Sequence, residues 1–466
     1  MKFTIKNVGT IESATIELGD FTIVCGANNT GKTYITYLVY GFITLAKELL
    51  DSQRELGFSI PKDTINTIVN DGIIKIDLKA YETQIPKILE KLGKQYTNYI
   101  PRILSAGKEF FHKSQFIIDP SVIKPNYTDG FKIAKGAKKR ELIEFFKEDG
   151  QAIMEVAVLS GDKTLLPSEN IIDDQINKVL IEIFFGKLFD NSIIITSERT
   201  GIALFHRELD THRNVLIEQL INRKDNEIIN PFEILDEQFA RYALPIKRNI
   251  DFTRDIPELT KRSSELFKDN KDVSRYISKN ILHGEIKYVN KQLVFEIKRN
   301  GETVRMPIYL SSSAVKSVLE LDIYIKHLAK KGDLLIIDEP ELNLHPDNQR
   351  QIVRLLARLV NCGIKIYVTT HSDYFLKELN NLVMLSNDFE NKKELMNEIG
   401  YDESEIISKE QIKAYAIKNT KKNISELQNV PIDKYGLQMD IFEELISSLN
   451  AVSDRIWFNI SDASND

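Results

Sequence analysis

Residues 334–371 constrain the fold of this chain more than any other stretch. They begin with four consecutive apolar residues, 334–337, a run too short for an independent helix but suited to a strand buried on both faces of a parallel sheet. A helix is expected from Pro346, because proline fits the first helical turn and apolar residues then recur on one face as far as Leu359. A second strand is expected at 364–368. This strand–helix–strand order predicts an α/β chain whose strands form a parallel sheet.

Polar residues follow both of these expected strands at the point where each strand ends. Asp338 and Glu339 come directly after the first strand, and His371 follows the second. The carboxyl ends of parallel strands meet at one edge of a sheet, where open α/β sheets bind their ligands. Two carboxylates and a histidine at such an edge are the groups that a phosphate-hydrolysing site requires.

A glycine-rich loop provides the second part of the expected site. A strand is predicted at 21–25, a helix is predicted from Tyr34 to about Leu50, and the segment between them reads GANNTGKT. This is G-x-x-x-x-G-K-[ST] in its required strand–loop–helix setting. Its glycines allow a tight turn whose N–H groups face phosphates, its lysine supplies a charge to the outer phosphates, and its threonine offers a hydroxyl to Mg²⁺. We therefore predict ATP and Mg²⁺ as cofactors, held by Gly26, Asn28, Asn29, Thr30, Gly31, Lys32 and Thr33.

Two other segments have two interpretations each. Glu198 and Arg199 follow a predicted buried strand at 193–196, so they could contact the nucleotide or Mg²⁺, or form a salt bridge within a loop. Ser311, Ser312 and Ser313 stand at the start of a predicted helix that runs through Leu328. They could cap that helix, or bind an anion through their hydroxyls and the exposed N–H groups.

Composition limits the class of protein. With 466 residues, of which 42% are hydrophobic and 28% charged, the chain is typical of a soluble protein with two or three lobes. It has no apolar run of 18 residues, its start alternates without an apolar signal core, and its two cysteines fit a reducing compartment, so we expect no membrane association and a cytoplasmic location.

The net charge of −6 argues against a generally basic, DNA-coating surface. Local basic clusters remain, either as solvated faces or as nucleic-acid or partner sites: Lys132, Lys135, Lys138, Lys139 and Arg140, and more diffusely Lys247, Arg248, Arg254, Lys261 and Arg262.

Taken together, these motifs resemble the head of ABC-type ATPases, which implies an α/β fold with a mixed sheet and flanking helices. The segments DEPELNLHP and TTHSDYF are similar to those of the branch that holds the SMC-like, RecF and OLD proteins. The nearest resemblance is to ATPase subunits of bacterial anti-phage systems such as Septu and PARIS. It rests on residues 1–50 and 280–385. In place of a glycine-containing signature segment, this chain has LSSSAVKS.

The resemblance implies a role for each matching residue. Asp338 supports the metal through water, Glu339 orients or deprotonates the attacking water, and His371 contacts the γ-phosphate. Ser311, Ser312 and Ser313 take the place of the signature segment, which reaches the ATP of a second subunit, so hydrolysis needs two heads that face each other. Glu341, Asn343 and His345 lie where the loop crossing that dimer interface is expected, with His345 as an interface or capping residue. Glu198 or Arg199 would replace the glutamine loop.

The resemblance also divides the chain. Residues 1–50, 191–202 and 283–385 would form the ATPase head, with a mixed α/β insertion at 51–190, a helical insertion at 203–282 and a C-terminal helical lobe at 386–466. Within these segments we expect strands at 73–78, 114–119, 152–159, 382–385 and 412–417, a hairpin at 284–308, and helices at 85–104, 141–147, 171–188 and 435–457.

Three functions follow as hypotheses. The first is a Mg²⁺-dependent ATPase whose head-to-head assembly controls a separate effector, a nuclease or a toxin, in anti-phage defence. The second is a RecF-like recombination or repair ATPase that clamps DNA. A self-contained nuclease is poorly supported, because no D-x-D or H-N-H-type pattern follows His371.

Overall fold

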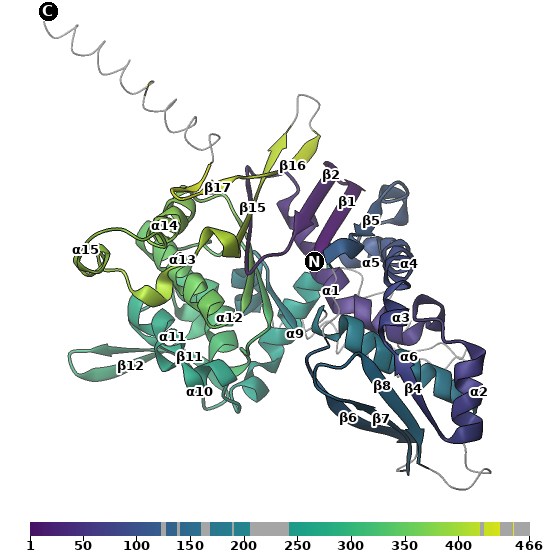
Figure 1. Ribbon diagram of the computed structural model, residues 1–466. Helices are drawn as coiled ribbons and strands as arrows, with labels where there is room; N and C mark the ends of the chain where they lie inside the picture. Colours follow the sequence, from purple (N-terminus) through teal and green to yellow (C-terminus); the bar gives the residue numbers. More distant parts are fainter. Residues whose placement is uncertain are drawn as a thin grey trace, which may run out of the picture.

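The computed structural model describes residues 1–122, 127–137, 140–159, 168–188, 191–205, 242–419, 424–438 and 451 (Figure 1). A mixed sheet of nine strands runs through this part of the chain, in the order β5-β1-β2-β16-β15-β3-β14-β13-β9. Its strands are β1 (Lys2–Val8), β2 (Ile11–Glu17), β3 (Phe21–Gly26), β5 (Gln115–Ile118), β9 (Ser192–Ile195), β13 (Leu334–Asp338), β14 (Lys365–Thr370), β15 (Ile412–Asn419) and β16 (Ser425–Asn429).

Helices cover both faces of the parallel part of this sheet. β3, β14, β13 and β9 run parallel to one another, and every residue of β3 and β13 is buried. Leu334 and Ile336 join a core shared with α1 (Lys32–Ser52), whereas Leu335 and Ile337 join a second core shared with α13 (Pro346–Asn361) and α14 (Asp373–Met384). Successive side chains of a strand point to opposite faces, so the apolar run is a strand between two helix layers. The predicted α/β class is confirmed.

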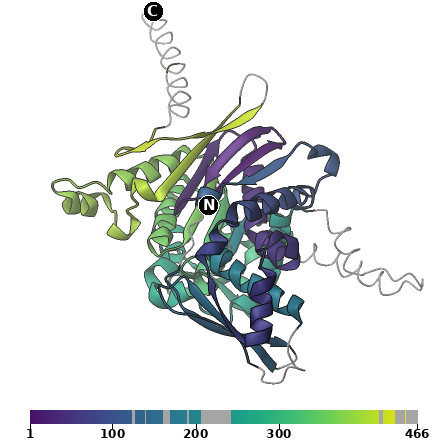
Figure 2. The ribbon, with the colours of Figure 1, turned by 45° about the vertical axis from the view of Figure 1, so that its right-hand side comes forward.

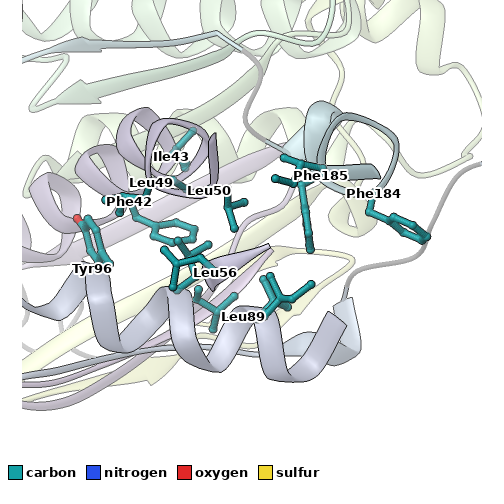
Figure 3. Close-up of a cluster of buried hydrophobic side chains, with 14 of the residues drawn as sticks. Phe42, Ile43, Leu49, Leu50, Leu56, Leu89, Tyr96, Phe184 and Phe185 are labelled. Atoms are coloured by element: carbon teal, nitrogen blue, oxygen red, sulfur yellow. The ribbon is translucent and has the colours of Figure 1, made fainter. Parts of the chain in front are cut away.

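The first of these cores holds α1 against the helices of the insertion (Figure 3). Phe42 of α1 meets Tyr96 of α4 (Ile85–Thr97), with ring centroids 5.2 Å apart. Phe184 and Phe185 at the end of α6 (Glu169–Phe185) belong to the same core. The helix that follows the glycine-rich loop therefore shares one core with α4 and α6.

The C-terminal part of the chain completes the central sheet. β15 pairs with β3 in parallel and β16 lies next to β2, so both strands sit between N-terminal strands (Figures 1 and 2). The strand predicted at 412–417 is confirmed, but β16 was not predicted. The remaining described elements after 385 are α15 (Lys392–Ile399), β17 (Ile432–Asp433), β18 (Gly436–Leu437) and short 3-10 helices at Glu403–Glu405 and Lys409–Gln411. The helix expected at 435–457 falls largely outside the described residues.

The insertion between α1 and β9 contains a second sheet, in the order β4-β8-β7-β6. Its strands are β4 (Ile73–Asp77), β6 (Phe131–Ala137), β7 (Arg140–Lys147) and β8 (Ile153–Val158), and its other helices are α2 (Lys62–Asp71), α3 (Lys79–Glu82) and α5 (Ile100–Leu104). The helix expected at 141–147 is wrong, because this segment is β7. Ile143, Phe145 and Lys147 are buried while Glu144 and Phe146 point outward, and the Lys147 ammonium is satisfied by the carbonyl oxygens of Tyr127, Asp129 and Glu148.

A helical segment and a small sheet lead to the serine-rich helix. They comprise α9 (Leu244–Leu259), α10 (Glu265–Asp269), α11 (Lys271–Ser274), a π-helical turn (Ile277–Ile281), β10 (Glu285–Val289), β11 (Gln292–Arg299), β12 (Glu302–Pro307) and α12 (Ser313–His327). The expected hairpin is a three-stranded antiparallel sheet, β10-β11-β12. The strand expected at 382–385 is wrong, since α14 continues to Met384. The helices expected at 206–241 lie outside the described residues.

Within the described ranges, no helix combines the length and apolarity needed to cross a membrane.

Candidate active site

The glycine-rich loop joins the carboxyl end of β3 to the start of α1. Gly31 has φ 98°, and a Cβ at this position would lie 2.9 Å from Cγ1 of Ile11. A glycine is therefore required both by the backbone conformation and by the close approach of the β1–β2 turn. Asn29 is also in the left-handed region, with φ 62°, a conformation that asparagine tolerates better than most residues.

Lys32 spans the loop from the first turn of α1. Its Nζ donates hydrogen bonds to the carbonyl oxygens of Gly26 and Ala27, at 2.8 and 2.9 Å. Burial lowers the pKa of this lysine, while the carboxylates of Glu339 and Asp338 act in the opposite direction. Lys32 thus bonds to the carbonyl end of β3, at the same end of the parallel strands as the acidic residues that end and follow β13.

Thr33 and Asp338 bring two oxygen ligands together. Thr33 Oγ1 donates a hydrogen bond to Asp338 Oδ2 at 3.3 Å, and Thr369 donates to the other carboxylate oxygen. Burial raises the pKa of Asp338, and the hydrogen bond from Thr369 partly offsets this rise. Oxygen ligands of this kind suit Mg²⁺. Among the described residues no three His, Cys, Asp or Glu side chains could hold a metal ion by themselves, so the fit requires the phosphate oxygens of a nucleotide as further ligands.

Glu339 and His371 meet at the same edge of the sheet. The backbone of Glu339 is left-handed, with φ 51°, and its N–H donates to the carbonyl oxygen of Thr369 at 3.1 Å. This turn directs the carboxylate toward β14, where Glu339 Oε1 lies 3.2 Å from Nδ1 of His371. The predicted catalytic pair is therefore brought together by the ends of two adjacent parallel strands.

Glu341 holds the turn that carries His371. Its Oε1 accepts hydrogen bonds from Thr370 Oγ1 at 2.6 Å and from the backbone N–H of His371 at 3.1 Å. Burial raises the pKa of Glu341, and these hydrogen bonds oppose the rise. Glu341 is thus buried beneath the histidine, whereas the resemblance placed it on the loop that crosses the dimer interface.

The three serines divide into a buried and an exposed set. Ser311 is buried and donates to the carbonyl oxygen of Ile308 at 2.6 Å. Ser312 is the N-cap of α12 and accepts from the Val315 N–H at 3.4 Å, so the capping interpretation is confirmed for this residue. Ser312 and Ser313 are exposed at the helix N-terminus, which leaves the anion-binding interpretation open for them.

Glu198 and Arg199 have different surroundings although they are neighbours. Glu198 is exposed, accepts a hydrogen bond from the Tyr37 hydroxyl at 3.2 Å and contributes to the raised pKa of Asp338. Arg199 is only 1% exposed and donates to the carbonyl oxygens of Thr196, Asp338 and Glu339. Glu198 therefore faces the possible metal site, whereas Arg199 lies behind the catalytic turn, a position that the sequence did not indicate.

Asn343 and His345 lie on the loop between β13 and α13. Asn343 has φ 60° and its side-chain amide donates to Thr200 Oγ1 at 3.3 Å. His345 is exposed and caps α13, accepting from the Asp347 N–H at 3.4 Å. The expected capping role of His345 is present in the structure. No role was predicted for Tyr37, Ser317, Thr369 and Thr370, whose hydroxyls bond to the site residues or their backbone. The TTH triplet was a signal for the two threonines and the LSSSAVKS segment for Ser317, but no local pattern indicated Tyr37.

The chain is similar to several known proteins. Over 81 residues the chain is 36% identical to a putative ABC transporter ATP-binding protein of Methanothermobacter marburgensis, which covers 17% of this chain and 28% of that protein. The chain thus matches less than a third of the length of this relative. It is also similar to an SMC head bound to the C-winged helix domain of ScpA (11% identity, 93% of this chain and 98% of the other, TM-score 0.35) and to the SMC head domain from Thermotoga maritima (10%, 92% and 98%, 0.31).

A family model covers most of the chain and all of the main site residues. The model of the AAA ATPase domain matches residues 1–376, a range that includes the glycine-rich loop, Asp338, Glu339 and His371. On this match, the chain belongs to the AAA ATPase domain family.

Proposed function

We propose that this chain is a Mg²⁺-dependent ATPase that hydrolyses ATP between two heads facing each other, and that its closed and open states control a separate effector, a nuclease or a toxin, in anti-phage defence. One observation carries the ATPase proposal. Lys32, Thr33, Asp338, Glu339 and His371 converge from three parallel strand ends on one edge of the sheet.

The loop and α1 would bind the phosphates. Backbone N–H groups of residues 26–33 and the positive end of α1 favour an anion at this position. Lys32 Nζ, now bonded to two carbonyl oxygens of the loop, would exchange them for outer phosphate oxygens. Thr33 and Asp338 would hold Mg²⁺, which supplies charge neutralisation to the phosphates.

Glu339 would act on the attacking water. Its carboxylate is close to His371, whose ring nitrogen lies 3.2 Å away. Glu339 would orient the water and accept its proton, and His371 would contact the terminal phosphate from the neighbouring strand end. Phosphoryl transfer depends mainly on such positioning and on charge stabilisation, so a carboxylate held by a strained turn is suited to the task.

The exposed end of α12 supports a site shared between two heads. Tyr309 and Leu310 are 57% and 66% exposed, directly before the exposed Ser312 and Ser313. An apolar pair next to two hydroxyls and a helix N-terminus can pack on a second protein surface while it binds phosphate there. A second copy of this chain with ATP in its glycine-rich loop offers both a protein surface and a phosphate group.

The insertion sheet supports the effector part of the proposal. Its outward face bears the exposed apolar residues Ile73, Phe146 and Ile153, which belong to adjacent strands. On this face the Lys75–Glu155 ion pair lies between Ile73 and Ile153, and a face that mixes exposed apolar and charged side chains suits contact with another protein. This face would bind the effector, away from the nucleotide site.

The Glu339→Gln variant tests the ATPase proposal. Because the amide cannot accept the proton of water, we expect ATP binding to persist, turnover to fall by about 100-fold or more, and the two heads to stay closed with ATP. Turnover measured by phosphate release, and mass measured by light scattering with and without ATP, check both points. Lys32→Ala is the matched control, which should lose nucleotide binding and remain monomeric. Wild-type turnover in Glu339→Gln would contradict the assignment.

The trapped variant also tests the effector. Glu339→Gln would be purified from its host with ATP present, and the proteins and nucleic acids bound to it would be identified. A stoichiometric partner with a nuclease or toxin fold, absent with Lys32→Ala, is the expected result. DNA retained without such a partner would instead support a DNA-clamping repair ATPase.

A further inference from the structure

Arg199 is a buried cation that lies between the two parts of the proposed shared site. It follows β9 and is 1% exposed. Burial lowers its pKa, but an arginine guanidinium stays charged in proteins. A buried permanent charge costs free energy of folding unless its N–H donors are hydrogen-bonded. The acceptors of the Arg199 donors show which segments this residue connects.

The guanidinium bonds to three segments at once. Its Nη groups donate to the carbonyl oxygens of Asp338 at 2.9 Å and Glu339 at 2.6 Å, the two residues at the end of β13. Its Nε donates to the carbonyl oxygen of Ser317 at 2.9 Å and approaches the Ser317 hydroxyl at 3.3 Å. A further bond to the carbonyl oxygen of Thr196 fixes the guanidinium to β9. Arg199 therefore ties the backbone of the catalytic residues to α12.

Ser317 extends this connection to the loop after β13. Its hydroxyl donates to the carbonyl oxygen of Leu342 at 2.6 Å, next to Asn343. Ser317 lies one turn into α12 from Ser313, so a displacement of the helix N-terminus moves Ser317 as well. The N-terminal end of α12 thus carries both the exposed Ser312 and Ser313 and the Ser317 that accepts from Arg199.

We propose that Arg199 is a positioning residue that couples α12 to the catalytic carboxylate. When the N-terminus of α12 docks on the ATP of a second head, the helix end shifts, and Arg199 passes this shift to the left-handed turn at Glu339. The coupling rests on the proposed function. An unpaired head would bind ATP, and its Glu339 would reach the catalytic position only when a second head docks. The planar guanidinium suits this role because its donors point in fixed, different directions; a lysine ammonium could not span the same acceptors.

Ser317→Ala tests the coupling with little change in packing. It removes the hydroxyl that bonds to Leu342 and faces Arg199, in a helix that accepts alanine readily. We expect kcat to fall about tenfold or more, while KM and the binding of a fluorescent ATP analogue stay as in the wild type. The matched control is Tyr324→Phe, which deletes another buried hydroxyl of the same helix, bonded to Asp333 Oδ2 at 3.0 Å. Its kcat should match that of the wild type.

Arg199→Lys provides the second variant. It keeps the charge but cannot reach Ser317 and Glu339 together, so it should reproduce the loss in kcat, and its combination with Ser317→Ala should cost little more than either change alone. Alanine keeps the Ser317 carbonyl oxygen that accepts from Arg199, so Arg199→Lys is the deciding variant. Wild-type kcat in Arg199→Lys, or equal losses in Ser317→Ala and Tyr324→Phe, would overturn the coupling and leave the ATPase proposal intact. A wild-type protein without ATP turnover would overturn the proposed function, and the coupling with it.

Discussion

Glu320 places a second ionisable group beside Arg199. It lies on α12, three residues after Ser317, and its carboxyl accepts hydrogen bonds from Asn249 Nδ2 at 2.8 Å and Thr253 Oγ1 at 3.2 Å. Burial raises the pKa of Glu320 to about 8, and the charge of Arg199 acts in the opposite direction. The folded state therefore favours the neutral acid, whereas the unfolded chain ionises near the ordinary value of 4.5.

This difference predicts how the free energy of unfolding depends on pH. The stabilising contribution of neutral Glu320 is fully present below the unfolded pKa and is lost as the pH rises through the folded pKa of about 8. Glu320→Gln keeps a neutral group able to bond Asn249 and Thr253. We expect its free energy of unfolding to depend less on pH than that of the wild type. The difference between the two proteins should change by an amount on the order of 1–3 kcal/mol between about pH 5 and pH 9. Denaturant unfolding across this range measures it, and parallel curves for the two proteins would contradict the expectation.

At the scale of elements, the glycine-rich loop depends on contacts with strands far away in sequence. The β1–β2 turn approaches Gly31 through Ile11, and β15 runs beside β3 so closely that a Cβ at Gly26 would lie 2.9 Å from the Ile417 carbonyl oxygen. The loop is thus shaped by a hairpin on one side and a C-terminal strand on the other.

Gly31→Ala tests this constraint. The added Cβ would clash with Ile11 and the φ of 98° would be strained, so the loop must shift away from the position that its N–H groups need. We expect nucleotide affinity to fall about tenfold or more, with secondary structure retained. Titration with a fluorescent ATP analogue and circular dichroism check this, and Gly72→Ala, also at positive φ but with open space around it, is the control that should bind normally. Unchanged affinity in Gly31→Ala would show that the loop tolerates the shift.

The elements around the site could be predicted from the sequence because local signals agree there. Residues 334–337 and the loop 26–31 have periodicity, glycines and neighbouring helices that all indicate one structure. β7 could not be predicted, because its exposed Phe146 and buried Lys147 reverse the usual contrast between apolar and charged faces. β16 has only five residues, mostly exposed, and depends on pairing with β2 and β15. The role of Arg199 depends on bonds to residues more than 100 positions away, which no local pattern contains.

At the scale of the whole molecule, the proposed function divides the catalytic groups of one head between two elements. The loop, Asp338, Glu339 and His371 gather at the edge of the central sheet, while Ser312 and Ser313 are exposed at the start of α12. The central sheet includes strands from both ends of the described chain, so the head forms one structural unit. Head-to-head assembly would then place the serines of each copy on the nucleotide of the other.

Complementation between two inactive variants tests this central claim most directly. Lys32→Ala removes nucleotide binding, and Ser313→Arg blocks the exposed serine surface without removing the Ser312 cap. Each variant alone should lack turnover. A mixed dimer keeps one intact site, made by the loop of the Ser313→Arg copy and the serines of the Lys32→Ala copy. An equal mixture should therefore regain a substantial part of the wild-type turnover, about a quarter if the copies pair at random. If the mixture stays as inactive as its components, or if Ser313→Arg alone hydrolyses ATP at the wild-type rate, the site is not shared between two heads.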